Sequence, residues 1–260
     1  MHKKALLVIS FGTSYAETLE KTIAATEKAL GQQFPQYDIK RAFTSQMVIN
    51  KLKKRDHLEI DTIAQAAERL LTAGYREILA QPLHIIHGSE YHAALTEFKP
   101  YVQHFARVAF GRPLLSLYAD YLAVVDALRD ELPVFKSAEA LIFMGHGSSH
   151  PANAAYAQLD MVFKDQGFPH IHVATVEGFP GLTTVIKHLK ADHVQKVTLM
   201  PFMLVAGDHA CNDMAGDGPQ SWKTILQKEG FAVVTRLVGL GEMEKIRQLY
   251  INHAQEAEGK

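Results

Sequence analysis

The sequence has 260 residues, of which 47% are hydrophobic and 21% are charged, as in ordinary globular proteins. Its formal net charge of −1 excludes the strong basic field of typical nucleic-acid-binding proteins. The single cysteine, Cys211, excludes an internal disulfide and any metal site built from several thiolates. No run approaches the roughly 18 apolar residues of a membrane span, and the N-terminal run lacks a cleavage site. We therefore expect a cytoplasmic protein without membrane or nucleic-acid partners.

The first half of the chain alternates strand-like and helical patterns. ALLVISF (5–11) is typical of a buried parallel strand. One face of a helix is then marked by Leu19, Ile23, Thr26 and Leu30. Residues 61–74 predict another helix, with Asp61 as its N-cap and Gly74 as its stop, and a strand follows within 76–86.

The second half repeats this alternation. Strands are predicted within residues 140–146, 170–177, 196–205 and 231–238. Helices are predicted near 152–164 and 182–190, and a terminal helix from about Glu242. Parallel strands joined by helices predict an α/β fold made of two similar, doubly wound parallel-sheet halves.

Two pairs of segments indicate an internal duplication. ALLVISFGTS (5–14) matches ALIFMGHGSS (140–149), and QPLHIIHGSE (81–90) matches MPFMLVAGDH (200–209). We predict an N-terminal half over residues 1–130 and a C-terminal half over residues 135–260. Because ligands bind beyond the carboxyl ends of parallel strands, we expect the site in a cleft between these halves.

The duplicated turns keep their glycines but change the neighbouring side chains. Phe11 stands where the second half has His146, and Glu90 stands where it has His209. A turn that accepts phenylalanine does not itself need histidine. We therefore interpret the second-half histidines as chosen for chemistry. Gly145 and Gly147 beside His146 would allow a ligand to approach the loop closely.

Three metal-binding side-chain types fall at the carboxyl ends of second-half strands. These residues, His146, Glu177 and His209, are separated by about one strand–helix unit each. Two imidazoles and a carboxylate with open positions suit a divalent transition metal. The alternative is that the histidines only cap loops or bond the backbone.

For the other polar side chains, the sequence gives weaker support for a role in catalysis or binding. His84 is expected as a core or strand-end residue, His87 near the cleft mouth, and Cys211 as a buried hydrophobe. Glu90 could accept protons or assist at the metal, or be a solvated carboxylate. Ser148 could bond a substrate, although serine before a helix is first a cap.

A basic run and several apolar side chains complete the candidates. Lys51, Lys53, Lys54 and Arg55 form a solvated helix face or, with Arg41, hold an anionic substrate. Phe11, Met47, Met203 and Leu204 could line a flat apolar pocket, although most methionines are core residues.

The segments KKALLVISFGTSY, RAFTS, LHIIHGSEY, FMGHGSSH and MPFMLVAGDHACNDMAGD run over nearly the whole chain. In them the sequence resembles the class II tetrapyrrole chelatases, above all the anaerobic sirohydrochlorin cobaltochelatases of cobalamin biosynthesis. The resemblance implies His146, Glu177 and His209 as metal ligands, and Glu90 as an acidic residue at the pocket. Two departures are His87 and Ser89, where an asparagine–glycine–aspartate run is expected, and the glycines Gly178 and Gly181.

The implied activity is insertion of cobalt(II), the substrate metal, into a sirohydrochlorin-type tetrapyrrole. His146 and Glu90 are the predicted catalytic residues. The substrate-binding residues are predicted to be Phe11, Gly12, Thr13, Ser14, Glu90, Ser148, Met203 and Leu204. No P-loop motif occurs, which predicts insertion without a nucleotide.

Several alternatives remain open. The metal could be iron or nickel, because the same ligands accept all three. The protein could be a non-catalytic tetrapyrrole or metal carrier, or a metal-dependent hydrolase. Exposed helices are compatible with a homo-oligomer.

Overall fold

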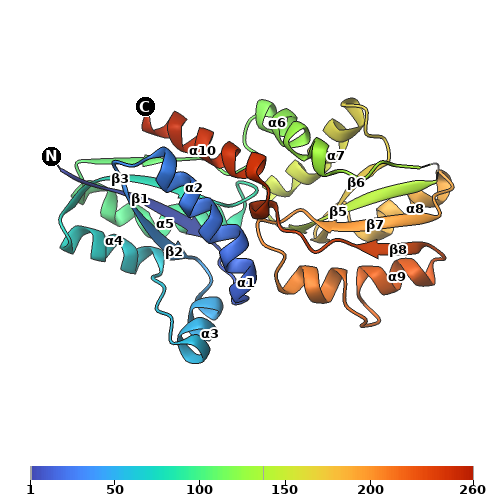
Figure 1. Cartoon of the computed structure of the whole chain (residues 1–260), viewed down its shortest axis with the longest axis horizontal. Helices are drawn as coiled ribbons and strands as arrows, with labels where there is room; N and C mark the ends of the chain where they lie inside the picture. The colour runs from blue at the N-terminus through green and yellow to red at the C-terminus, as the bar shows by residue number, and fades with distance from the viewer. Residues whose placement is uncertain (1, 137, 260) are drawn as a thin grey trace. The chain divides into compact units, whose positions relative to one another are not determined.

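Two units make up the chain in the computed structural model, which describes residues 2–136 and 138–259. The first unit comprises Met1–Ser116 and Gly241–Lys260, and the second comprises Leu117–Leu240. Each unit contains one four-stranded parallel sheet (Figure 1).

The first sheet has the strand order β2-β1-β3-β4. Its strands are β1 (Lys3–Ser10), β2 (Asp38–Phe43), β3 (Tyr75–Pro82) and β4 (Arg107–Phe110). β1 is central, and its residues from Ala5 to Ser10 are buried on both faces. A strand covered by helices on both sides needs such a continuous apolar run.

Helices cover both faces of the first sheet. They are α1 (Ala16–Leu19), η1 (Glu20–Ala24), α2 (Ala25–Gln33), α3 (Gln46–Asp56), α4 (Ile63–Thr72), α5 (Ser89–Phe98), η2 (Lys99–His104) and α10 (Glu244–Glu258). Ile63 of α4 and Phe98 of α5 pack with Leu7 on one face. Tyr250 of α10 is fully buried, and its hydroxyl donates a 3.1 Å hydrogen bond to the Leu83 carbonyl.

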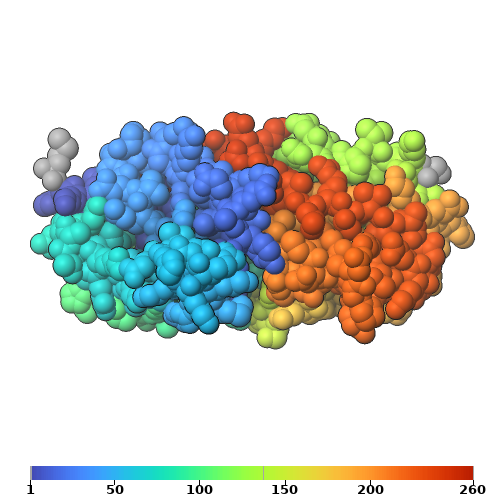
Figure 2. Space-filling view, turned by 60° about the horizontal axis from the view of Figure 1, so that its bottom comes forward, coloured from blue at the N-terminus to red at the C-terminus, as the bar shows by residue number. Residues whose placement is uncertain are grey.

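The terminal helix therefore belongs to the first unit, whereas the sequence pattern predicts a single half over residues 135–260. Arg112 forms an ion pair with Glu256, and Gln36 donates a 3.1 Å hydrogen bond to Glu258. In Figure 2 the red atoms of α10 lie beside the blue atoms of the N-terminal helices, and α10 contacts α2. Burial of the apolar face of α10 on this sheet is the physical reason for the different division.

The second sheet has the equivalent order β6-β5-β7-β8. Its strands are β5 (Glu139–Gly147), β6 (Ile171–Glu177), β7 (Lys196–Pro201) and β8 (Ala232–Thr235). Its helices are α6 (Tyr118–Leu128), η3 (Arg129–Glu131), η4 (Pro151–Asn153), α7 (Ala154–Asp165), α8 (Leu182–Ala191), η5 (His209–Met214) and α9 (Trp222–Lys228). The short η6 (Leu240–Glu242) leads out of this unit.

Alternate residues of β5 face different helices. Phe143 stacks on Phe163 of α7 at 5.5 Å between ring centroids. Ile142 and Met144 instead belong to a core cluster with Val185 of α8 and Trp222 of α9. Figure 1 shows the two helix layers on either side of this sheet.

The matching topologies confirm the prediction of two similar α/β halves. β1 and β5 are both central, and each leads into a glycine with positive φ, at +93° for Gly12 and +84° for Gly147. One local prediction was wrong by a residue: Thr62, not Asp61, caps α4, because its side chain and that of Gln65 form a capping box. No helix within the described residues has the length and apolarity that a membrane span requires.

Candidate functional site

His146 lies at the carboxyl end of β5, on the face that carries Ala140, Ile142 and Met144. The half-buried imidazole of His146 therefore follows directly after these apolar side chains on the same face of the strand. Its Nδ1 lies 2.9 Å from the carbonyl oxygen of Gly147. Since a carbonyl only accepts, Nδ1 must carry the proton, and the Nε2 lone pair of the neutral ring is available to a ligand.

The glycines around His146 are required by internal packing. A Cβ on Gly145 would come within 2.4 Å of the Tyr156 ring, and one on Gly147 within 1.6 Å of the Glu177 carbonyl oxygen. At these two positions α7 and β6 occupy the space that was predicted to be open to a ligand.

His209 begins η5, a short π-helix after β7. Its Nδ1 lies 2.6 Å from Oδ2 of Asp213. Nδ1–H donates to this carboxylate, which again presents Nε2 as a lone-pair donor. π-Helical turns are often found at functional sites.

The imidazoles of His146 and His209 are neighbours. Their ring centroids are 4.7 Å apart and their planes are nearly perpendicular, at 89°. Both rings have Nδ1 engaged by a hydrogen bond, so the pair can offer two Nε2 donors to one metal ion. Asp213 was missed in the sequence; its signal is the four-residue spacing from His209, which places both on one face of a helical turn.

Glu177 ends β6, the neighbour of β5 on the other side from β7. It is in register with Gly147 and therefore shares the face of Gly147, opposite that of His146. Within the described part of the chain, no group of three or more His, Cys, Asp or Glu side chains is arranged to hold a metal ion. The structure brings the two histidines together, and the ligand role of Glu177 stays a prediction.

The other second-unit candidates surround these strand ends. Ser148 accepts a 3.0 Å hydrogen bond from the backbone N–H of His150 through Oγ, as turn serines do. His150 in turn accepts from the Ala152 N–H at 3.1 Å and caps η4. Leu204 is buried, and Met203 packs against the core cluster of this sheet. Cys211 is half-buried, and burial raises the pKa of its thiol.

Four predicted substrate-binding residues follow β1 at the carboxyl edge of the first sheet. Phe11 is 47% exposed, whereas Thr13 and Ser14 are 4% and 7% exposed. Gly12 lies against the ring of Phe43, which a Cβ would approach to 2.4 Å. Phe11 is therefore the residue of this stretch with an accessible side chain.

Glu90 lies in the first turn of α5, also in the first unit, and is exposed. A carboxylate there also stabilises the helix dipole. His87 contacts Ser116, with Nε2 2.7 Å from Oγ. Both ring nitrogens of His84 are buried without a hydrogen-bond partner in the described structure, and burial lowers the pKa of His84 to about 4. His84 lies two residues beyond β3 with both ring nitrogens buried, which agrees with the expectation of a core or strand-end residue.

The basic side chains are engaged locally. Arg41 forms two hydrogen bonds with Glu27, at 2.7 and 2.5 Å. Arg55 bonds Asp56 and the Ser14 carbonyl, and Lys53 pairs with Glu59 at 3.3 Å. These contacts favour the interpretation of a solvated, salt-bridged surface. Met47, on the same helix α3, is 73% exposed.

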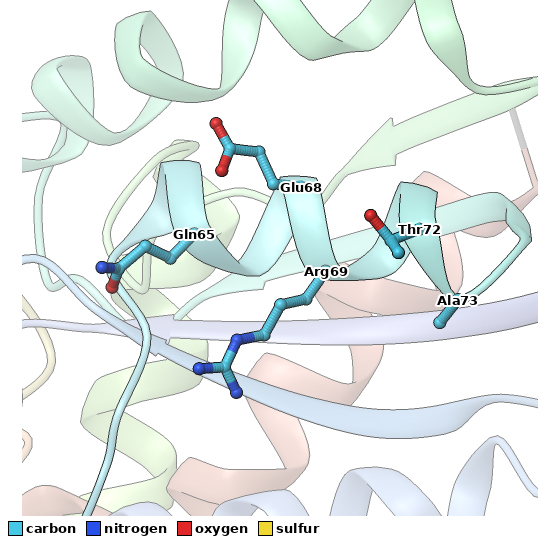
Figure 3. A pocket seen from close by; sticks show the side chains of 5 residues that line it. All are labelled: Gln65, Glu68, Arg69, Thr72 and Ala73. Atoms are coloured by element: carbon cyan, nitrogen blue, oxygen red, sulfur yellow. The ribbon is translucent and has the colours of Figure 1, made fainter.

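A surface hollow of about 390 Å³ lies elsewhere, along α4 (Figure 3). It is lined by Gln65, Glu68, Arg69, Thr72 and Ala73. All five come from one helix and its end, and Figure 3 shows Glu68 and Arg69 pointing in different directions. None is a predicted site residue.

Two solved structures share the fold of this chain. SirB from Bacillus subtilis, solved with Fe3+, matches with a TM-score of 0.67 at 15% identity, over 99% of this chain and 98% of that one. CbiX, described as the terminal enzyme of siroheme biosynthesis in denitrifying bacteria, matches with a TM-score of 0.55 at 15% identity, over 97% and 99%. At 15% identity, these structural similarities establish the fold alone.

Sequence comparison is more specific. The sirohydrochlorin cobaltochelatase of Salmonella typhimurium is 46% identical over 255 residues, which cover 98% of this chain and 96% of the relative. The sirohydrochlorin cobaltochelatase CbiKC of Nitratidesulfovibrio vulgaris is 31% identical over 256 residues, covering 97% and 90%. The family model for cobalt chelatase (CbiK) matches residues 4–258. The chain belongs to the CbiK cobalt chelatase family.

Proposed function

We propose that this protein inserts cobalt(II) into sirohydrochlorin in anaerobic cobalamin biosynthesis, without a nucleotide. The observation that carries the proposal is the pair of imidazoles at the carboxyl edge of the second sheet, 4.7 Å apart between ring centroids. Both rings have Nδ1 hydrogen-bonded, so both can direct Nε2 lone pairs at one ion. The two cobaltochelatase relatives and the family support the same reaction.

A small donor set suits an ion that must leave the protein. Four protein ligands in a closed shell would hold a metal as a structural site does. Two imidazoles, with Glu177 as a third donor when its side chain turns toward them, leave coordination positions for the ring nitrogens. We therefore propose His146, His209 and Glu177 as the ligands of the incoming cobalt.

The reaction also releases protons. Metal-free sirohydrochlorin gives up two pyrrole N–H protons as the ion bonds to its four ring nitrogens. We propose that His146, as its coordination loosens, and the exposed carboxylates Glu177 and Glu90 accept these protons and pass them to solvent. Phe11, Gly12, Thr13, Ser14, Ser148, Met203 and Leu204 are the proposed substrate contacts.

The deciding experiment is a metal-insertion assay with metal-free sirohydrochlorin, followed by its visible absorption. Cobalt(II), iron(II) and nickel(II) are compared singly and in competition, with and without ATP. We expect several product molecules per chain, cobalt preferred, and no effect of ATP. At most one metallated product per chain would identify a carrier instead, and no tetrapyrrole binding would favour the metal-dependent hydrolase.

Two further predictions concern the environment of the protein. We propose a cytoplasmic location, which cell fractionation measures. We also propose a homo-oligomer, which sedimentation velocity at several concentrations measures.

A further inference from the structure

An exposed aromatic side chain, Phe179, follows shortly after Glu177, one of the predicted metal ligands. Phe179 is 65% exposed and lies two residues after Glu177, in the segment 178–181 between β6 and α8. A single exposed aromatic residue is not unusual. The backbone that carries this one, however, is held from several sides.

Asn153 connects this segment to the loop after His146. Its Nδ2 donates a 2.6 Å hydrogen bond to the Phe179 carbonyl, and its Oδ1 accepts a 3.0 Å hydrogen bond from the Ser148 N–H. One side-chain amide therefore ties together the two loops that follow β5 and β6.

The next residue along is held by the sheet itself. The Pro180 carbonyl accepts hydrogen bonds from the Thr175 N–H at 2.7 Å and from its hydroxyl at 3.1 Å. Gly178 has a φ of +108°, and a Cβ there would lie 3.0 Å from the Ser148 carbonyl oxygen. The segment is thus packed onto Ser148, the second residue after His146.

We propose that Phe179 is a substrate-binding residue whose ring packs against a face of the tetrapyrrole; this rests on the proposed function. A planar conjugated macrocycle offers the π-surface on which aromatic rings stack. Because the backbone of Phe179 is already ordered, little conformational entropy is lost when the ring is covered. Binding would remove an exposed apolar ring from water.

The test measures the dissociation constant of metal-free sirohydrochlorin by absorption titration, with no metal present. Phe179→Ala should weaken binding about tenfold, the factor expected when one stacking contact of about 1.4 kcal/mol is lost. Phe179→Tyr keeps the ring and should bind as the wild type does. Cobalt(II) affinity, measured without the tetrapyrrole, should be the same in both variants.

Tyr118→Ala is the matched control, since Tyr118 lies on α6 of the same unit and is 56% exposed. It should leave the dissociation constant unchanged. An unaltered dissociation constant in Phe179→Ala, or an equal loss in the control, would overturn the proposal while wild-type cobalt insertion leaves the proposed function standing. If the wild type binds no tetrapyrrole, both are overturned.

Discussion

Hydrogen bonds at Nδ1 define what the two site histidines can do. His146 and His209 each donate from Nδ1 to a fixed acceptor, the Gly147 carbonyl and the Asp213 carboxylate. The acceptors differ in strength, because a carboxylate makes a charge-assisted bond. We therefore expect His209 to be the more strongly oriented ring.

His146→Ala should abolish cobalt insertion while the protein stays folded. The substitution removes one of the two Nε2 donors, and the remaining imidazole of His209 cannot hold the ion alone. Insertion rate and the urea midpoint of unfolding are the measurements. Turnover like that of the wild type would remove His146 from the mechanism.

Asp213→Ala should weaken cobalt(II) binding by about 10- to 100-fold, the usual cost of losing a partner that orients a metal-binding histidine. The reason is the 2.6 Å contact that fixes the tautomer of His209. Titration with cobalt(II), followed by its visible bands, measures the effect. Asn212→Ala is the control on the same π-helix, where the exposed Asn212 side chain bonds Asp208 instead. Equal losses in the two variants would indicate a general disturbance of η5.

At the scale of elements, the sequence located the strand ends but not the faces of the strands. An apolar run followed by Gly-His-Gly identifies where β5 ends, so His146 was placed correctly at its carboxyl end. Whether Glu177 shares its face depends on the register between β5 and β6, which is set by pairing across the sheet. A single sequence contains no direct signal for that register.

For the same reason, a single sequence does not reveal the roles of Gly145 and Asn153. In the sequence alone, Gly145 indicates space for a ligand, whereas in the structure the ring of Tyr156 of α7 packs against it. Asn153 has no distinguishing pattern in the sequence, because its hydrogen-bond partners lie in two loops that only the folded sheet brings together. Contacts that are local in space but distant in sequence were the ones missed.

Gly145→Ala should destabilise the second unit by about 1–3 kcal/mol, the usual cost of overpacking. The added methyl group would lie 2.4 Å from the Tyr156 ring. Gly181→Ala is the control, since the nearest atom to its Cβ would be 3.8 Å away. Urea unfolding followed by the fluorescence of Trp222, the one tryptophan and a buried residue of this unit, measures both. A shorter side chain, as in Tyr156→Leu, should reduce the cost of Gly145→Ala; an unchanged cost would show that this ring is not the obstacle.

At the scale of the whole molecule, a segment's position along the chain does not determine which unit it belongs to. The duplicated strand–helix pattern predicted two halves, and both sheets have the same order. The return of α10 to the first unit was missed because an amphipathic helix does not reveal which sheet its apolar face covers. The buried contacts of Tyr250 with the β3 end decide it.

In each unit, burial lowers the pKa of a histidine. Burial lowers the pKa of His84, in the first unit, to about 4. Burial, with a smaller effect of Lys164, lowers the pKa of His172, in the second unit, to about 4. Asp160, His188 and Asp192 are the other charged or titratable groups that influence His172.

These two histidines predict a loss of stability in mild acid. A histidine in the unfolded chain takes up a proton near its ordinary pKa of 6.5, whereas the folded His84 and His172 do so only near 4. Between these values the unfolded chain binds more protons, so the free energy of unfolding falls as the pH falls. The stability present above pH 6.5 is lost progressively toward pH 4, by up to about 3 kcal/mol for each histidine.

Urea unfolding at about pH 7 and about pH 5 tests this linkage. Trp222 fluorescence follows the second unit, while far-ultraviolet circular dichroism follows both units. His172→Leu should reduce the acid loss seen by Trp222, and His84→Leu should leave that signal's pH dependence unchanged while reducing the loss seen by circular dichroism. His104→Gln, at an exposed position, serves as the control. A Trp222 signal whose pH dependence survives His172→Leu would mean that other groups govern the acid sensitivity of the second unit.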